Sequence, residues 1–531
     1  MLFTSYRFIG FMAAVFLLYY LLPKKCQWPF LLAASYTFYY IANPYYLIFI
    51  GVTTVSTYAV SLRIDAWKER QDAYLKSHKD TLNREEKKAY KASVKAKQWR
   101  WLLLCLVFNL GILAVLKYTN FMIANLNGLL EAFGRGGRIS FADLILPMGI
   151  SFYTFQTMGY IIDVYRGTCR AEKNLFRLAM FVSFFPQLVQ GPISRYNDLA
   201  KSLYERHDFD TKTVSYGLYR ILWGYFKKVV VADRILAAVN TIINDPETYQ
   251  GGFVFVGMLF YALELYADFT GGIDITIGIA ETMGITVTEN FRRPYLSKNI
   301  KEYWKRWHIT MGTWFTDYIF YPISVCKPML KLSKFSRRKL GDFIGKRVPV
   351  YLASFAVWFT TGIWHGASWN FIVWGLMNFV VIMVSQECEP LYGKFHARFD
   401  IKGEKWYGAF EILRTIFLMS SLRMFDCYRD VPLTFRMFGN MFSHFRLQDL
   451  TKEAFLGLGL TGADYIVLFI CLAVMVTVSL TQERKGSVRD LIYASPEICR
   501  YVVFLMMVLS VVIFGAYGIG YDQSQFIYNQ F

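Results

Sequence analysis

The chain has 531 residues, of which 55% are apolar and only 18% are charged, whereas about 25% are charged in a typical soluble protein. This composition excludes a set of soluble domains, a disordered chain and a disulfide scaffold, because so apolar a surface needs lipid around it. The net charge of +19 fits Lys and Arg concentrated in cytoplasmic loops better than nucleic-acid binding. We therefore expect an all-α polytopic membrane protein with no nucleic-acid partner.

Apolar windows of membrane length recur along the whole chain. The first, 6–22, is followed by Pro23-Lys24-Lys25 and by no cleavage site, so we expect a retained membrane segment rather than a signal peptide. Several windows contain Gly, Pro or charge, so some should be half-helices or interfacial, and we expect roughly ten to twelve membrane helices. The other windows lie at 45–62, 101–117, 141–162, 175–190, 214–243, 253–283, 349–364, 369–385, 405–422, 463–480 and 501–519, and 28–42 can add one more.

Two basic loops define the expected cytoplasmic side. Residues 63–100 contain twelve Lys/Arg and six Asp/Glu, and their Ala, Lys, Glu and Arg content favours a helical hairpin at the surface. Residues 327–347 contain eight basic residues and one acid, so both loops should be cytoplasmic. The apolar run 307–323 has basic flanks on both sides. It should therefore dip into the membrane and return, or lie along the interface, and line a cavity open to the cytoplasm.

His308 lies in an aromatic pattern with spacings of three and four, which predicts one stripe of a helix. A lone histidine is usually a core residue hydrogen-bonded to a neighbour, and that interpretation stays open beside a functional one. The stripe consists of Trp304, Trp307, His308, Met311, Trp314, Phe315 and Tyr318.

His365 interrupts hydrophobic sequence about 18 residues after Arg347, which is roughly 27 Å along a helix. In one straight helix it would lie toward the outer side of the membrane, and a kink at Gly362 would place it deeper. A structural histidine at a helix break is the alternative. Two histidines so placed suggest a path from a cytoplasmic donor to an outer acceptor, because a neutral imidazole can accept a hydroxyl proton.

Three acids also lie in apolar sequence. Glu264 and Asp268 share a helical face, and Asp274 follows; paired carboxylates can do acid/base work, but backbone hydrogen bonds or an arginine partner are the more common role. Arg195 lies in the segment 183–196, which Pro186, Gly191 and Pro192 break, and it is either an anion contact or, more commonly, a snorkelling side chain. The eight cysteines and six histidines have no metal-ligand spacing. We expect buried thiols, no metal and no bound cofactor.

At these residues the chain resembles the membrane-bound O-acyltransferase (MBOAT) family, in the subgroup of the alginate O-acetylase membrane subunit. The blocks that carry the resemblance are GISFYTFQTMGYIIDVYRG at 149–167, FFPQLVQGPISRY at 184–196, YADFTGGID at 266–274, ENFRRPYLSKNIKEYWKRWHITMGTWFTDY at 289–318, WHGASWNFIVWG at 364–375 and the tail FIYNQF at 526–531. The chain departs from the subgroup at Thr316, where Arg is usual, and at Gly272 and Asn529, where aromatic residues are usual.

The resemblance implies a single membrane domain over 1–531, with a basic cytoplasmic helical loop at 63–100, a core at 140–385 that carries the motif blocks, and C-terminal helices at 400–531. It implies re-entrant segments around a tunnel, and transfer of an acyl group, expected to be acetyl from acetyl-CoA, towards an extracellular polysaccharide. His365 corresponds to the family's active-site histidine and His308 to its second motif histidine. The further substrate or tunnel-lining candidates are Trp304, Trp307, Asp317, Trp364, Asn370, Asp268 and Arg195.

The expected location is the bacterial cytoplasmic membrane. The expected partners are the lipid bilayer, the polysaccharide acceptor, and an accessory O-acetyltransferase that is secreted or anchored on the outer side. Two alternatives remain open. One keeps the fold and transfers D-alanine from a carrier protein to teichoic acid, although the 149–167 block fits those enzymes less well. The other is a transporter without chemistry, which predicts an inverted repeat that this sequence does not show.

Overall fold

The computed structural model describes residues 3–134 and 137–517, and this part of the chain is helical with no strand. The tail 526–531 and its Asn529 lie outside the described residues. The chain divides into two compact units, Met1–Val214 with Ile279–Thr288, and Ser215–Gly278 with Glu289–Phe531. The all-α fold is thus confirmed, while a single domain over 1–531 stays a prediction.

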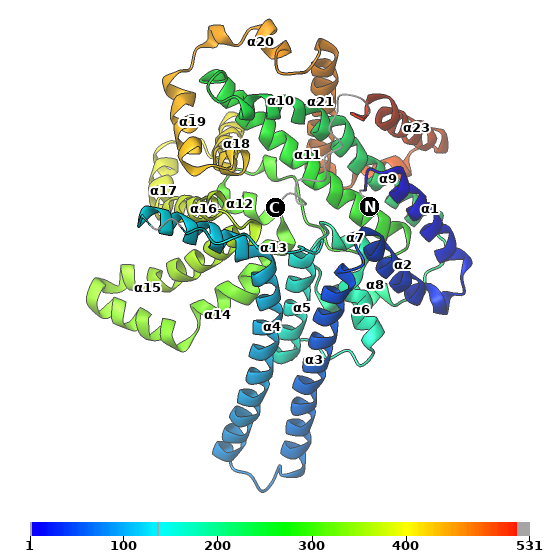
Figure 1. The fold of residues 1–531 in the computed structure, drawn as a ribbon, viewed down its shortest axis with the longest axis vertical. Coiled ribbons are helices and arrows are strands. Elements are labelled where there is room, and N and C mark those ends of the chain that lie inside the picture. The colour runs from blue at the N-terminus through cyan, green and yellow to red at the C-terminus, as the bar shows by residue number, and fades with distance from the viewer. Residues whose placement is uncertain (1–2, 135–136, 518–531) are drawn as a thin grey trace. The chain divides into compact units, whose positions relative to one another are not determined.

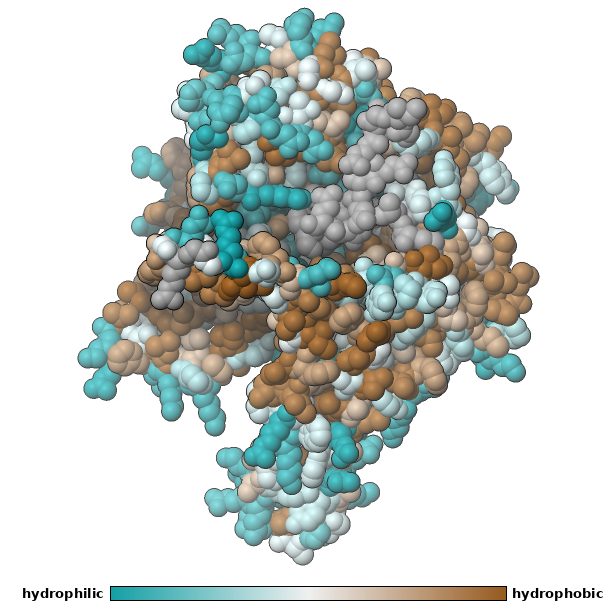
Figure 2. All heavy atoms as spheres, in the orientation of Figure 1, coloured by the Kyte–Doolittle hydropathy of each residue, from teal (hydrophilic) through white to brown (hydrophobic). Residues whose placement is uncertain are grey.

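The first unit is organised around a long helical hairpin. Figure 1 shows α3 and α4 side by side, joined by a short loop, and Asn83 with Glu86 forms a capping box at the start of α4. The tip of this hairpin is hydrophilic and the segments nearer the rest of the unit are apolar (Figure 2). Because α3 ends at Ser77 and α4 begins at Arg84, the helical hairpin predicted for 63–100 is confirmed. The helices are α1 (Tyr6–Leu21), α2 (Gln27–Ala42), α3 (Tyr46–Ser77), α4 (Arg84–Ala132), α5 (Ile150–Arg166), α6 (Leu175–Ser183), α7 (Phe185–Leu188) and α8 (Tyr196–Leu203).

The second unit carries the two predicted site histidines. Its chain begins within α9 (Thr211–Tyr225), which continues through the π-helical turn η2 (Phe226–Ala232) into α10 (Asp233–Asn244). The helices that follow are α11 (Gly252–Thr282), η3 (Pro294–Leu296), α12 (Ile300–Arg306), α13 (Ile309–Phe315), η4 (Thr316–Phe320), α14 (Tyr321–Ser324), α15 (Lys327–His365), α16 (Trp369–Glu387), α17 (Glu389–Arg398), α18 (Lys405–Tyr428), α19 (Val431–Ser443), η5 (Leu447–Asp449), α20 (Lys452–Leu456), α21 (Gly462–Lys485), α22 (Val488–Ala494) and α23 (Glu497–Phe514).

Six helices in the described residues are long and apolar enough to cross a membrane, namely α3, α4, α11, α16, α21 and α23. Other predicted windows form shorter or bent elements. The window 175–190, for example, is split between α6 and α7 at Phe184, as expected for a segment interrupted by Pro186. A total of ten to twelve membrane helices therefore stays a prediction.

The prediction of one helical stripe over 304–318 is wrong. The chain breaks at Trp307 and His308, and His308 adopts a left-handed backbone conformation with φ 46° between α12 and α13. The break is stabilised by the preceding segment, because Arg292 N–H donates to the Arg306 carbonyl and Ile309 N–H donates to the Asn290 carbonyl, both at 2.9 Å. The run 307–323 consequently forms only short helices, none long enough to cross a membrane.

Helices α15 and α16 form an antiparallel hairpin that carries His365 at one end. At the other end Arg347 Nε donates to Glu387 Oε1 at 2.7 Å. The kink in α15 lies at Gly341, with φ 79° and ψ 166°, rather than at Gly362, so α15 remains helical from there to His365. Near His365 the two backbones approach closely, since a Cβ on Gly362 would lie 2.6 Å from the Phe371 carbonyl oxygen.

Candidate active site

His308 is fully buried and is held through the oxygen of Asn290. Its Nδ1 lies 3.2 Å from Asn290 Oδ1, which also receives the Thr310 N–H at 3.1 Å and the Thr310 hydroxyl at 2.9 Å. A backbone N–H can only donate, so the atom it reaches on Asn290 is the amide oxygen. His308 Nδ1 must therefore donate to the same oxygen, and Nε2 carries the lone pair of the ring. A buried histidine hydrogen-bonded to a neighbouring side chain is typical of a structural core residue, but here the hydrogen bond to Asn290 also fixes the tautomer of His308.

His308 lies outside the six helices long enough to cross a membrane, and its environment keeps the ring neutral. Burial, and to a smaller extent the Arg423 guanidinium, lower the pKa of His308 to about 3. The ring packs edge-on against Phe269 at a centroid distance of 5.1 Å. At physiological pH this side chain is thus an uncharged hydrogen-bond acceptor at Nε2 and a donor at Nδ1.

His365 is the last residue of α15 and is 7% exposed. Its ring lies edge-on to Trp374 at 4.8 Å and to Trp364 at 5.1 Å between ring centroids. The Trp364 ring also lies 6.1 Å from the ring of His308. The structure therefore brings both predicted histidines next to the ring of Trp364, although 56 residues of sequence separate them.

A buried arginine joins the tryptophans of this cluster. The Arg423 guanidinium carbon lies 4.8 Å from the ring centroid of Trp374, 5.1 Å from that of Trp307 and 6.0 Å from that of Trp304. Its Nη1 pairs with Asp426 Oδ2 at 2.8 Å. The predicted candidates Trp304, Trp307 and Trp364 are thus brought together in one aromatic cluster.

Sequence reasoning missed three members of the site. Asn290 and Trp374 stand inside the motif blocks, but nothing in their spacing indicates that they contact a histidine. Arg423 gives a clearer signal, because it is a cation directly after the apolar window 405–422 and cations in such positions need a partner. The indole N–H groups of Trp304 and Trp374 are buried and have no acceptor among the described residues, so both remain available as donors.

The remaining predicted residues have different surroundings. Asn370 Nδ2 donates to the Phe425 carbonyl at 3.1 Å and links the start of α16 to the end of α18. Asp317 lies half-buried in η4. Arg195 belongs to the first unit, where it is exposed at the N-terminus of α8. Roles for Asn370, Asp317 and Arg195 in the reaction stay predictions.

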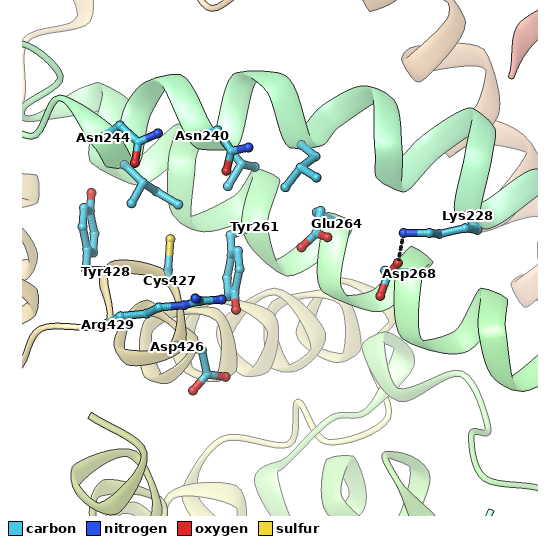
Figure 3. A pocket seen from close by; sticks show the side chains of 13 residues that line it. Lys228, Asn240, Asn244, Tyr261, Glu264, Asp268, Asp426, Cys427, Tyr428 and Arg429 are labelled. Atoms are coloured by element: carbon cyan, nitrogen blue, oxygen red, sulfur yellow. Dashed lines mark ion pairs between the residues drawn. The ribbon is translucent and has the colours of Figure 1, made fainter. Parts of the chain in front are cut away.

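Two aspartates of α11, Asp268 and Asp274, form ion pairs with cations from α9 and η2. Asp268 is fully buried and pairs with Lys228 at 2.5 Å (Figure 3), and Asp274 pairs with Arg220 at 2.9 Å and with Lys227 at 2.5 Å. The expected pairing with an arginine is thus found for Asp274, whereas the partner of Asp268 is a lysine. Both aspartates are therefore paired with a cation in the described structure, as a buried carboxylate must be to offset its loss of hydration.

Comparison with known proteins places this site inside a recognised sequence region. Residues 169–426 match the sequence model of "MBOAT, membrane-bound O-acyltransferase family". The chain is 31% identical over 480 residues to the probable alginate O-acetylase AlgI of Azotobacter vinelandii, covering 89% of this chain and 84% of the relative. It is 36% identical over 380 residues to the probable alginate O-acetylase AlgI of Pseudomonas aeruginosa, covering 71% and 64%. It is 29% identical over 428 residues to the peptidoglycan O-acetyltransferase of Helicobacter pylori, covering 75% and 72%.

Proposed function

Because this chain belongs to the membrane-bound O-acyltransferase family and is a multi-pass membrane O-acyltransferase, we propose that it passes acetyl groups from cytoplasmic acetyl-CoA across the membrane. The acetyl groups serve the O-acetylation of a cell-surface polysaccharide. The observation that carries this proposal is the contact of His308 and His365 with the same tryptophan, Trp364, within the range matched by the family. This constellation offers a proton acceptor and a positioning group at one point.

The direction of transfer is supported by the α15–α16 hairpin. Basic residues gather on α15 at the end marked by the Arg347–Glu387 ion pair, and His365 lies at the opposite end. Positive charge favours the cytoplasm, so His365 lies toward the outer half of the membrane. A donor that enters from the basic end would meet the acceptor near the histidines. We place the protein in the cytoplasmic membrane of a bacterium, around a tunnel that connects the two sides.

His365 serves as the general base in this proposal. Its imidazole takes the proton of the acceptor hydroxyl while the oxygen attacks the thioester carbonyl carbon. The new C–O bond forms as the C–S bond breaks. The CoA thiolate then takes the proton back from the imidazolium and leaves as the thiol, so the ester and free CoA are the products and no other reactant is needed.

His308 acts as a positioning group rather than as an oxyanion donor. An Nε2 with a lone pair can accept a hydrogen bond from an N–H or O–H group of the donor, but it cannot donate one to a carbonyl oxygen. The buried indole N–H groups of Trp304 and Trp374 are donors of the required type, and Trp374 already lies against His365. We assign them to the negative charge that develops on the thioester oxygen.

The outer acceptor is either the polysaccharide itself or an accessory O-acetyltransferase that is secreted or anchored on that side. Two alternative functions make different demands. D-alanyl transfer to teichoic acid needs an aminoacyl carrier protein as the donor, and a transporter needs no donor at all. A transporter has no use for a histidine of fixed tautomer beside a second histidine. D-alanyl transfer would use the same chemistry, and we favour acetyl transfer because the O-acetylase and O-acetyltransferase relatives match 89% and 75% of this chain, whereas a D-alanyltransferase relative matches 50%.

The test has a cellular and a biochemical part. Ester-linked acetate on surface polysaccharide is measured in cells with and without the gene, and the purified protein in nanodiscs is supplied with labelled acetyl-CoA or with D-alanyl carrier protein. We expect loss of polysaccharide acetate in the deletion strain and turnover of acetyl-CoA alone in vitro. Unchanged acetate on every polymer, or turnover of D-alanyl carrier protein only, would contradict the proposal.

A further inference from the structure

The second unit contains a polar pocket that the reaction described above does not use. It has a volume of about 300 Å³ and lies between η2 and α10 on one side, α11 on another and the end of α18 on the third (Figure 3). Asn240, Asn244 and Arg429 are exposed, whereas Lys228 and Asp268 are buried. The pocket therefore has a solvated mouth at the asparagines and a floor at the Lys228–Asp268 ion pair.

The pocket opens at the same end of the unit as His365. Its wall at 426–429 is the end of α18, and Phe425 accepts the hydrogen bond from Asn370 at the start of α16. The residue Asn370 follows His365 by five positions, while Arg347 and Glu387 mark the far end of the same hairpin. By the charge argument for direction, the mouth belongs to the outer half of the protein.

Glu264 lies between the mouth and the floor and requires a hydrogen-bond donor. The side chain is 4% exposed, and its Oε2 has no hydrogen-bond partner among the described residues. Figure 3 shows it projecting from α11 into the space between Tyr261 and Asp268. A buried carboxylate oxygen without a donor is costly, so the position indicates that a ligand or ordered water completes it.

The charges that surround the pocket restrict the class of ligand. The carboxylates of Asp268 and Asp426 are already paired with Lys228 and Arg423, so the pocket offers no strong excess of either charge to an anion or an ammonium group. The described residues contain no group of three His, Cys, Asp or Glu side chains placed to hold a metal ion. A neutral ligand that both donates and accepts hydrogen bonds satisfies all of these groups.

We propose that this pocket binds one neutral sugar residue of the hydroxyl-rich acceptor. Sugar hydroxyls can donate to Glu264 Oε2 and accept from the amides of Asn240 and Asn244, while the Tyr261 ring offers an apolar face to ring C–H groups. A volume of about 300 Å³ is at the lower limit for ligand pockets, which fits a single ring rather than a longer segment. The identification of the ligand as the acceptor rests on the proposed function, whereas the binding of a neutral saccharide does not.

The experiment measures saccharide binding to the purified full-length protein in detergent by titration calorimetry. The probes are two neutral oligosaccharides, chitotetraose and mannotetraose, and one anionic one, tetramannuronate. The variants are E264Q, which keeps the shape of the side chain, and N240W, which places a bulky ring at an exposed position in the mouth. The control is E411Q, since Glu411 is a half-buried glutamate on α18 outside the pocket. Binding of acetyl-CoA is measured in parallel.

We expect at least one neutral oligosaccharide to bind saturably. E264Q should weaken that binding about threefold or more, because an amide nitrogen at the Oε2 position cannot accept the hydrogen bond of a sugar hydroxyl, and N240W should abolish it. E411Q should bind like the wild type, and acetyl-CoA binding should not change in any variant. Failure of both neutral probes to bind, tighter binding of tetramannuronate, or wild-type binding by N240W would overturn the proposal. Neutral saccharide binding without any acetyl transfer would instead contradict the proposed function, while the proposal that this pocket binds a neutral sugar would still hold.

Discussion

Replacement of His365 by alanine is the most direct test of the proposed proton transfer. A positioned general base contributes about 10²–10⁴ to the rate, which corresponds to roughly 2.7–5.4 kcal/mol of activation free energy at about 1.4 kcal/mol per tenfold change. The ring that is lost packs against Trp364 and Trp374. Truncating a buried aromatic ring to alanine costs about 3–5 kcal/mol of folding free energy for Phe or Trp, and the smaller imidazole should cost less. The catalytic and stability effects are thus of similar size, so the assay has to separate them.

The assay compares acetyl transfer per folded protein for the wild type, H365A and H365Q. Each variant is purified in nanodiscs, the folded fraction is taken by size exclusion, and its melting temperature is recorded. H365Q fills most of the space of the ring and separates the loss of the base from the loss of packing. The matched control is H396A, because His396 lies in α17, where its Nε2 contacts the Tyr407 hydroxyl at 2.8 Å, and it takes no part in the proposed reaction.

We expect H365A and H365Q to lose transfer to a similar extent, with H365Q closer to the wild type in stability, and H396A to remain active. Activity of H365A within tenfold of the wild type would refute the assignment of His365 as the base. Loss of activity that follows the loss of folded protein, with H365Q restoring both, would show that the histidine is structural. H308A should reduce transfer less than H365A, because a positioning group is partly replaced by water.

Three further predictions concern the surroundings of the histidines. N290A should lower transfer about 10–100-fold, because the oxygen that orients His308 is lost, and N290D should retain more activity in the same nanodisc assay. Since the pKa of His308 is about 3 in the folded protein and 6.5 in the unfolded chain, the unfolded state binds the extra proton between these values. The free energy of unfolding should therefore fall as the pH is lowered below about 6.5, by at most about 1.4 kcal/mol per pH unit from this group. The melting temperature should fall with it, and H308Q should reduce this pH dependence. G375A should cost about 1–3 kcal/mol and reduce transfer, because its Cβ would overlap the Trp358 carbonyl oxygen, whereas G393A, with nothing within 4 Å, should melt no lower than the wild type.

Much of the fold could be predicted from the sequence because composition and charge act locally. The hairpin of α3 and α4 follows from helix-forming residues in 63–100 and from apolar windows on both sides. The failure of the run 307–323 to form a spanning helix follows from the basic residues that flank it. Both predictions depend only on residues within the segment itself, so no knowledge of tertiary contacts was needed.

The break at His308 could not be predicted in this way. The aromatic spacing over 304–318 is correct for a helix, but the backbone groups of 290–292 bond to Arg306 and Ile309 instead. These tertiary hydrogen bonds stabilise the left-handed conformation of a non-glycine residue, which costs on the order of 1–3 kcal/mol. Likewise, no spacing rule places Arg423 over Trp374, since the two residues belong to different helices. The histidines were found by their chemistry, and their partners only by the fold.

The environments of the two histidines explain why one protein would use both. A base must gain and release a proton during each cycle, which requires a pKa near the working pH. His308 does not meet this requirement, because burial keeps its pKa near 3 and Asn290 fixes its proton on Nδ1. A ring of this kind is suited to hold a neutral donor group without titrating. Proton transfer must then fall to the second ring, and His365 is the histidine that shares Trp364 with His308. If H308A moved the pH dependence of transfer more than H365Q did, this division of roles would have to be reversed.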